Sequence, residues 1–522
     1  MSDSRAIPHG KPIPASESAP GAVVGVDSPG EIGDAPDPGD APNVPSADGG
    51  GSLGEPPIHS DEVTAIEGAP IAVTPESNPA TRSRFGPLKH RAFRNVWLGA
   101  FGSSVGGWME QIGVQWVVAH ESEQPMLAMS WLAAAHLAPT FVFGLHGGIL
   151  ADRVNRRMLL LVTQAILMVI ATAIAIASAT GHATPTVLIW LTLGYGVTVA
   201  FNVPAWQVLT PRLVPREELT EAIGLNGLQF NMARVIGPGI AGILLANYGA
   251  TVLFVVNTVS FVGVLTAVAF TPDSPAPPRD GSSWWQQTKE ALRFTFHERG
   301  PRAAFFAMVV FSFLAVPLLR MLPIFVKDVF HAEERAFGWL TAVMGLGAVV
   351  GVLLMRRVPA WYPKHHLIPV SVLGAGIAMS IFCSTESLAV GFAAMFVIGG
   401  FWLLTYNSTF SAMQLLVNDS MRGRVLAVCN VAVFGAMPLG SFVAGLIGEY
   451  ASGRAEAGAG AQIGVGVLGV VLALSGLVMM IWRTPEVDGL RPGDAGYDRN
   501  PGLLSGLTAA GHRPASRTRP GS

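Results

Sequence analysis

The sequence predicts an all-α membrane protein in which twelve transmembrane helices form two pseudo-symmetric bundles of six. Half of the 522 residues are hydrophobic and only 13% are charged, a composition too apolar for an ordinary soluble chain of this length. Apolar stretches as long as a bilayer requires recur twelve times between residues 94 and 482. A longer polar segment divides these stretches into two groups of six.

The apolar stretches are expected to be helices rather than strands. They lack the roughly ten-residue alternation of outer-membrane barrel strands, and each is long enough for a helix to satisfy its own backbone hydrogen bonds. The expected spans are 94–118, 126–150, 157–180, 185–209, 219–246, 250–271, 302–326, 336–356, 366–384, 388–416, 423–448 and 461–482.

Polar and small residues recur in the same order in the two groups. The fourth and fifth spans carry Gln207, Asn226, Pro238 and Gly242, and the tenth and eleventh carry Gln414, Asn430, Pro438 and Gly445. Repeated halves are how many secondary transporters build a site at their interface. The repeat therefore favours a transporter, although apolar sequence of low diversity also produces such matches by chance.

The predicted organisation has five parts. They are a disordered acidic tail over 1–88, a first bundle over 89–271, a cytoplasmic central loop over 272–301, a second bundle over 302–484 and a disordered tail over 485–522. Residues 1–81 hold 13 acidic and two basic side chains, a net charge of −11, and lack the apolar run needed for a core. Within the central loop, the aromatic and basic segment from Trp284 is either a helix lying at the inner leaflet or a plain linker.

Basic residues predict the orientation. The connections on one side hold Arg153, Arg156, Arg157, Arg212, Arg216, Arg356, Arg357, Lys364, Arg422 and Arg424, whereas those on the other hold Lys327, Arg335 and Arg454. Because Lys and Arg accumulate in cytoplasmic loops, both termini are expected in the cytoplasm. The chain is thus predicted to be a multi-pass protein of the inner (plasma) membrane.

A charged segment after the second span, GILADRVNRR at 148–157, resembles the loop signature of the major facilitator superfamily, with Asn155 in place of its second glycine. Asn tolerates the left-handed backbone that Gly would supply there. The resemblance implies the major facilitator fold and a conformational latch between the halves. The latch would be formed by Gly148, Asp152, Arg153, Arg156 and Arg157. Alternatively, these arginines act only as positive-inside anchors.

The fifth span adds a second motif, ARVIGPGIAG at 233–242, which resembles the antiporter motif of the same superfamily. With the segment that leads into it, it is similar to the transmembrane secretion effectors, the branch that includes the enterobactin exporter. Its key residues are Gly237, Pro238, Gly239 and Gly242. They are expected to bend the helix and allow close packing, either as a seal against ion leak in an exporter or as ordinary small-residue packing.

Ionisable residues deep in the bilayer default to functional hypotheses because they are costly there. Glu110 is the one carboxylate well inside a predicted span, and Arg234 is the most deeply placed cation. Both are proton-coupling candidates, Glu110 as the proton carrier and Arg234 as the group that sets its pKa or receives an anionic substrate group. A static buried pair is the alternative. The further cavity candidates are Asn231, Arg320, Asn407 and Gln414.

Enzyme functions lack support in the sequence. It has no Walker loop, no Cys or His cluster with metal-ligand spacing, and no convincing nucleophile and base, so neither a metal nor another cofactor is expected. We expect a monomeric, proton-coupled exporter of a hydrophobic organic molecule, such as a siderophore, drug or secondary metabolite. Its partners would be the small-molecule substrate, protons and the bilayer, but no nucleic acid. A solute and proton symporter, or a non-transporting sensor or scaffold, are the alternatives.

Overall fold

The computed structural model describes residues 85–209, 212–271, 284–355, 357, 362–452 and 457–490. Regular structure in this part of the chain is entirely helical. Most of the two predicted tails, 1–84 and 491–522, lies outside the described residues.

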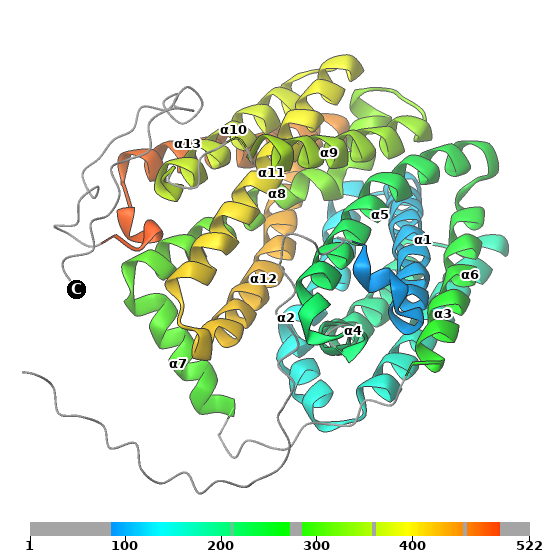
Figure 1. The fold of residues 1–522 in the computed structure, drawn as a ribbon. Coiled ribbons are helices and arrows are strands. Elements are labelled where there is room, and N and C mark those ends of the chain that lie inside the picture. Colours follow the sequence, from blue (N-terminus) through cyan, green and yellow to red (C-terminus); the bar gives the residue numbers. More distant parts are fainter. Residues whose placement is uncertain are drawn as a thin grey trace, which may run out of the picture. The chain divides into compact units, whose positions relative to one another are not determined.

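Two groups of long helices make up the protein (Figure 1). The N-half contains α1 (Arg91–Glu121), α2 (Pro125–Arg153), α3 (Arg156–Ala179), α4 (Pro185–Leu209), α5 (Leu219–Tyr248) and α6 (Ala250–Ala269). The C-half contains α8 (Arg299–Ile324), α9 (Glu334–Met355), α10 (Lys364–Ser384), α11 (Leu388–Leu416), α12 (Asp419–Ser452) and α13 (Ala457–Ile481). A shorter helix, α7 (Trp284–His297), lies between the two groups in the sequence.

The helix boundaries confirm the expected spans. The largest difference between a predicted and an observed end is four residues, as at the start of α12, where 423 was expected and Asp419 is found. In the described part of the chain, eleven helices are long and apolar enough to cross a membrane. The remaining long helix, α1, does not meet this measure although it spans 31 residues. Its polar residues, which include Glu110, Gln111 and Gln115, line a cavity.

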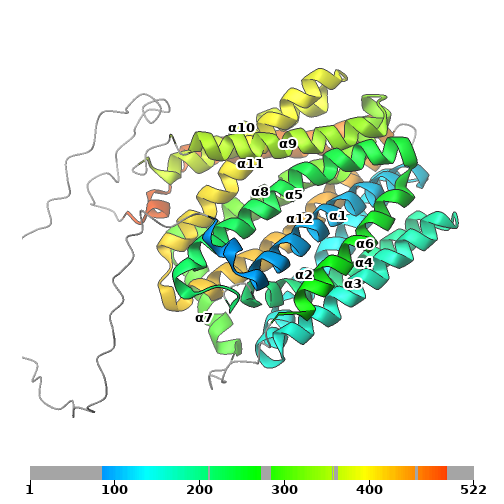
Figure 2. The same ribbon diagram turned by 45° about the vertical axis from the view of Figure 1, so that its right-hand side comes forward.

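The same helix pairs pack in both halves. In the N-half, α2 packs on α4, α1 on α5 and α3 on α6, and in the C-half the corresponding pairs are α9 with α11, α8 with α12 and α10 with α13. The repeated prolines occupy equivalent helices, since Pro238 lies in α5 and Pro438 in α12. This correspondence, which Figures 1 and 2 allow the reader to follow, is the expected pseudo-symmetry.

Helix ends follow local sequence signals. Pro125 and Pro185 stand at the first positions of α2 and α4, where a missing backbone N–H costs nothing. Gly249 separates α5 from α6 with a φ of 77°, a left-handed conformation that favours glycine. Asn155 corrects one expectation, because it is extended (φ −62°) rather than left-handed. Its side chain instead accepts hydrogen bonds from the backbone N–H groups of Arg157 and Met158 and so caps α3.

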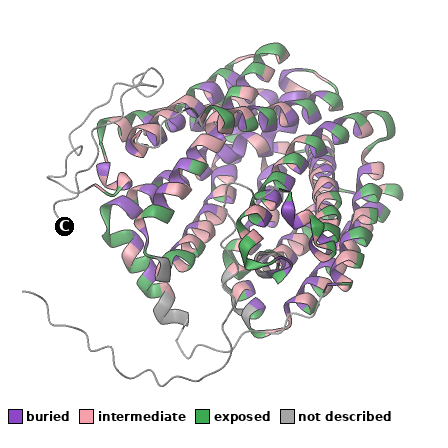
Figure 3. Cartoon of the chain, in the orientation of Figure 1, coloured by how far each residue is buried: buried purple, intermediate pink, exposed green. Residues whose placement is uncertain are grey.

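Many large apolar side chains are exposed along the helices (Figure 3), among them Val169, Trp190 and Leu474. A soluble monomer rarely exposes so much apolar surface. The protein is a multi-pass membrane protein, and these side chains form the surface that meets lipid.

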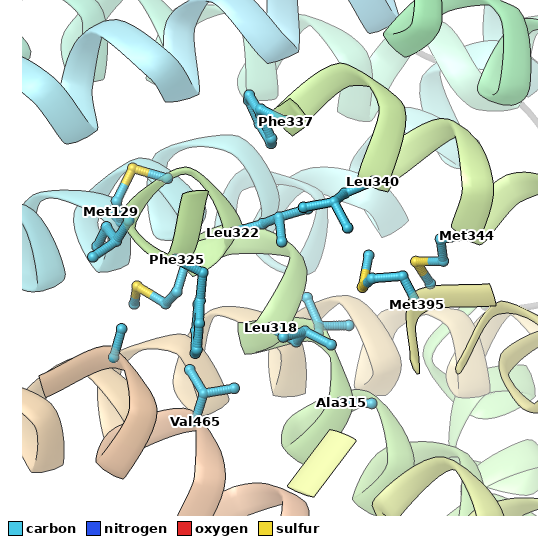
Figure 4. Packing of buried hydrophobic residues seen from close by; sticks show 14 of the residues in the cluster. Met129, Ala315, Leu318, Leu322, Phe325, Phe337, Leu340, Met344, Met395 and Val465 are labelled. Atoms are coloured by element: carbon cyan, nitrogen blue, oxygen red, sulfur yellow. The ribbon is translucent and has the colours of Figure 1, made fainter. Parts of the chain in front are cut away.

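Among the described residues, the apolar core joins the halves at one end of the molecule. One cluster combines residues of α1, α2, the end of α5 and the start of α6 with residues of α8 and α9. Its N-half members begin at the middle of α1 and lie toward the end away from residues 147–158. Leu318, Leu322 and Phe325 stand at its centre, with Met129 of α2 nearby (Figure 4). We call this the predicted outer end, because the basic connections lie at the opposite, predicted cytoplasmic end.

At the predicted cytoplasmic end the core is divided. One cluster contains only N-half residues, such as Phe93, Leu159 and Leu209, and another contains only α7 and C-half residues, such as Phe305 and Val425. No described cluster bridges the two halves there. In the predicted orientation, the structure is therefore in an inward-open arrangement.

The central segment forms a helix rather than a plain linker. In α7, Ala291 and Thr295 are buried against the C-half, whereas Leu292 and Phe296 are largely exposed. Phe296 also packs edge-on against Phe305 of α8 at 5.1 Å between ring centroids. One face of α7 is thus docked and another presents apolar side chains, as expected for a helix at a membrane surface, although its position in the bilayer stays a prediction.

The predicted tail over 485–522 is ordered at its beginning, which corrects its expected disorder there. A short 3-10 helix (Pro485–Asp488) follows α13 and packs on α8, α10 and α11. The carboxylate of Asp488 accepts hydrogen bonds from the backbone N–H of Lys364 at 2.7 Å and that of His365 at 3.1 Å, and it contacts the His365 ring at 2.5 Å. These bonds cap the start of α10 and join it to the short helix.

Removing this cap is expected to destabilise the protein. Partial burial raises the pKa of the Asp488 carboxyl, but the bonds from His365 and from the two backbone N–H groups outweigh it, so the pKa lies below its ordinary value. The stabilisation is therefore present above the ordinary carboxyl pKa and is lost as pH falls through the folded value. Asp488→Ala is expected to lower the free energy of unfolding at neutral pH by about 1–3 kcal/mol.

Thermal exposure of the buried thiols of Cys383 and Cys429 to a maleimide dye measures this effect. The exposed Glu386 lies in the α10–α11 connection, and Glu386→Ala is the matched control. Equal unfolding midpoints for both variants would show that the cap does not stabilise the fold.

Candidate transport cavity

A cavity of about 730 Å³ lies between the two halves. Its lining comes mostly from α1, α4 and α5, with contributions from α2, α3, α6, α8, α11 and α12. It extends from the middle of the molecule toward the predicted cytoplasmic end, where Trp97, Trp206 and Asn226 line it. The volume is within the range of pockets for small organic molecules.

Glu110 lies in the wall of this cavity and is 6% exposed. Its carboxylate accepts a 2.6 Å hydrogen bond from the side-chain amide of Asn257 on α6. Asn257 is fully buried, and its own amide oxygen accepts a bond from Ser260 at 3.3 Å. This second bond fixes the NH₂ group of Asn257 toward Glu110, so the carboxylate is held in one position while the cavity lies beside it.

The two predicted deep cations line the same cavity from opposite halves. Arg234 comes from α5 and is half-buried, whereas Arg320 comes from α8 and is 8% exposed. In the described part of the chain, neither guanidinium forms an ion pair with Glu110.

The other predicted cavity residues lie elsewhere. Among described residues, the cavity lining does not include Asn231, Asn407 or Gln414. Asn231 donates to the carbonyl oxygen of Gly227 within its own helix, and Asn407 and Gln414 are exposed. The sequence placed these residues on the correct helices, but it did not resolve which face of each helix meets the cavity.

The loop signature makes local contacts. Gly147 packs against the carbonyl oxygen of Ala200 on α4 so closely that a Cβ would clash, whereas a Cβ on Gly148 would meet no atom within 4 Å. Arg156 is buried and donates to the carbonyl oxygen of Ala151 at 3.4 Å. Arg157 donates to the carbonyl oxygen of Ala269 at the end of α6.

Arg153, by contrast, is exposed, and the side chain of Asp152 lies outside the described residues. Gly148 has open surroundings, and the apolar core is divided between the halves at this end, so the described contacts of the signature lie within the N-half. The latch role stays a prediction for the other conformation.

The α5 motif forms part of the contact between halves at the predicted outer end. Gly237 packs against α1, where a Cβ on the glycine would lie 2.6 Å from the Cβ of Trp108. Gly242 faces Gly338 of α9, and a Cβ on Gly338 would clash with the carbonyl oxygen of Pro238. The small residues therefore allow α5 and α9 to pack backbone to backbone.

Other contacts close the same end. Ser130 of α2 donates to the carbonyl oxygen of Ser441 on α12 at 2.8 Å. Arg335 of α9 donates to the side chain of Asn247 on α5 at 3.0 Å, and Trp116 of α1 stacks on the Phe337 ring of α9 with ring centroids 6.0 Å apart. Each contact joins the N-half to the C-half, so all of them must break before this end can open.

Comparison with protein families agrees with this geometry. The family model described as "Transmembrane secretion effector" matches residues 82–494, which is most of the chain. The chain belongs to the transmembrane secretion effector family. It is accordingly a transporter of the major facilitator superfamily and not an enzyme.

Relatives of this secretion effector include two named transporters of siderophores. It is 24% identical to the staphyloferrin A transporter of Staphylococcus aureus over 65% of this chain and 85% of that protein. It is 25% identical to the enterobactin exporter EntS of Escherichia coli over 74% of this chain and 92% of that protein.

Its fold is that of solved transporters. The inward-facing, unoccupied structure of a bacterial homologue of the human lysosomal transporter Spinster matches with a TM-score of 0.57 at 15% identity. The match covers 76% of this chain and 95% of the other. At this identity the likeness supports the fold alone.

Several cavity residues of the secretion effector escaped the sequence analysis. Tyr195 of α4 stacks on the His136 ring of α2 at 5.4 Å between centroids, and both line the cavity. Gln111 and Gln115 lie beside Glu110 on α1. The low hydropathy of α1 was the signal that could have found these glutamines, because a long helix that is too polar for lipid must direct its polar face to a cavity.

Proposed function

We propose that this chain is a proton-coupled exporter of a hydrophobic organic molecule, such as a siderophore, drug or secondary metabolite, and that it works by alternating access as a monomer in the inner membrane. The observation that carries the proposal is the position of Glu110, a buried carboxylate in the wall of a cavity between two halves whose described apolar clusters join at one end. The likeness to the staphyloferrin A transporter and the enterobactin exporter supports siderophores as cargo.

The proposed cycle begins with both termini in the cytoplasm and the cavity open to it. Substrate enters from the cytoplasmic side while Glu110 releases its proton, the halves rock, and the contacts at the outer end separate. Substrate leaves, Glu110 takes up a proton outside, and the protein returns. The mixed lining of the cavity supports this cargo class, since Trp108, Phe230 and Trp402 offer aromatic surface beside hydrogen-bonding groups.

A pH gradient supplies enough energy for substantial accumulation. Each pH unit is worth about 1.4 kcal/mol per proton, which supports a tenfold substrate gradient at one proton per substrate. Because antiport moves the two species in opposite directions, substrate should gather on the acidic side whichever way the protein is inserted. Symport would gather it on the alkaline side.

Proteoliposomes with an imposed pH gradient test this proposal. The probes are iron-free enterobactin and iron-free staphyloferrin A, and pyranine in the lumen reports proton movement. We expect one probe to accumulate about tenfold per pH unit in vesicles with an acidic lumen, with alkalinisation of the lumen and loss of both signals on adding nigericin. Accumulation in an alkaline lumen, or accumulation that ignores nigericin, would contradict proton-coupled export.

A further inference from the structure

The cavity carries more positive charge than its own residues balance. Among the described residues that line it, Glu110 is the one carboxylate, and its bonded partner is the amide of Asn257. Arg234 and Arg320 line the same cavity, and neither guanidinium forms an ion pair with a described residue. With Glu110 ionised the cavity has a net charge of +1, and with Glu110 protonated it has +2.

A buried or partly buried charge without a partner is costly, so an anionic ligand gains by supplying one. Guanidinium is also the cation best suited to carboxylates, because its planar N–H groups match the two oxygens. The two guanidiniums come from different halves, Arg234 from α5 and Arg320 from α8. One ligand with two acidic groups could therefore engage both halves.

The C-half contributes a single charged side chain to the described lining of the cavity. Its contribution to the described lining consists of Val316, Leu319, Arg320, Trp402, Phe434 and Met437. Arg320 is the one charged side chain in this set. On the N-half, Arg234 lies beside aromatic surface, because Phe230 is one turn away on α5 and packs on Trp108 at 6.4 Å between ring centroids.

We propose that the transported molecule is an apolar or aromatic body with two acidic groups, one bound by Arg234 and the other by Arg320. This inference rests on the proposed transport function and specifies its substrate class. A dianion that bridges the arginines offsets the repulsion between them as the halves close around the cavity. A molecule without two acidic groups does not offset the repulsion between Arg234 and Arg320. The charge of a molecule therefore decides whether it is transported.

A matched series of probes tests the proposal. N-(1-naphthoyl)-glutamate has an aromatic body and two carboxylates, N-(1-naphthoyl)-glutamine has one, and the amide of the latter has none. Titration calorimetry on the full chain in lipid nanodiscs measures their binding. We expect the dianion to bind about tenfold more tightly than the monoanion, and the neutral diamide to bind most weakly.

Substitution of each arginine tests whether it binds one of the two carboxylates. Arg234→Gln and Arg320→Gln are each expected to weaken dianion binding about tenfold, to the level of the monoanion, with a much smaller effect on the diamide. Arg293→Gln on the exposed face of α7 is the matched control and should bind like the unaltered protein. Retained diamide binding shows that a weakened variant is still folded.

Equal affinities for the three probes, tighter binding of the diamide, or no binding of the dianion would each overturn the proposal. The outcome is separable from that of the transport proposal. If the three probes bind with equal affinity and the diamide still accumulates under a pH gradient, proton-coupled export is supported and the proposal of a dianionic substrate is wrong. If the dianion binds much more tightly but no probe accumulates under a pH gradient, the dianionic substrate class is supported and proton-coupled export is wrong.

Discussion

Glu110→Gln is expected to abolish the accumulation of substrate that a pH gradient drives, while substrate exchange between the two sides of the membrane continues. The substitution keeps the shape of the side chain and its ability to accept a hydrogen bond from Asn257, which lies 2.6 Å away. It removes the site that binds and releases the proton. The two halves can still rock with bound substrate, but nothing then ties this motion to proton movement.

The expected magnitude is large. The unaltered protein should reach a substrate ratio of about ten per pH unit, and the variant should reach about one, the value at equilibrium without coupling. Counterflow of labelled substrate into vesicles preloaded with unlabelled substrate measures the exchange that should persist. Glu121→Gln, an exposed position at the end of the same helix, is the matched control.

Retained gradient-driven accumulation in Glu110→Gln would remove Glu110 from the coupling step. Loss of both accumulation and counterflow would indicate that the residue is needed for the conformational change itself, which also contradicts a pure proton role. The exchange measurement therefore separates the coupling step from general damage to the protein.

The fold was readable from the sequence because lipid imposes a simple rule. A segment that crosses a bilayer must be long, apolar and internally hydrogen-bonded, so the spans could be placed to within four residues. The cost of charge in lipid likewise indicated Glu110 and Arg234, and both line the cavity. Neither argument needs any knowledge of how the helices pack.

Uncharged polar residues carried much less information. Asn231, Asn407 and Gln414 share their residue types with the cavity-lining Asn202 and Gln229, yet only the latter pair reach the cavity. A single amide costs little in a helix, because it can bond within its own helix as Asn231 does to Gly227. Such residues therefore fail to mark the face that meets the cavity.

The conformational state was also outside the reach of the sequence. Gly148 of the loop signature has open surroundings, whereas Gly242 of α5 is packed against Gly338. Under the proposed alternating access, both serve an inward-open and an outward-open arrangement, so one sequence would encode two sets of contacts whose energies differ little. Only coordinates reveal which set is formed.

A disulfide across the predicted outer end is expected to stop transport completely and reversibly. A Cβ added to Gly239 of α5 would lie 3.8 Å from the Cβ of Ala342 on α9, within the 3.5–4.5 Å range typical of disulfides, and the one other contact within 4 Å is to Trp339. The bond would join the N-half to the C-half at the contact that must separate during the cycle. It would thereby hold the protein in the arrangement described above.

The central claim is that the two halves rock about the cavity and part at the predicted outer end in each cycle. The most direct test is substrate counterflow by Gly239→Cys with Ala342→Cys, in a background where Cys383 and Cys429 are replaced by alanine, before and after oxidation. The account predicts counterflow at the level of empty liposomes after oxidation, full recovery with dithiothreitol, and no effect of oxidation on either single cysteine variant. Undiminished counterflow with the disulfide formed would contradict it.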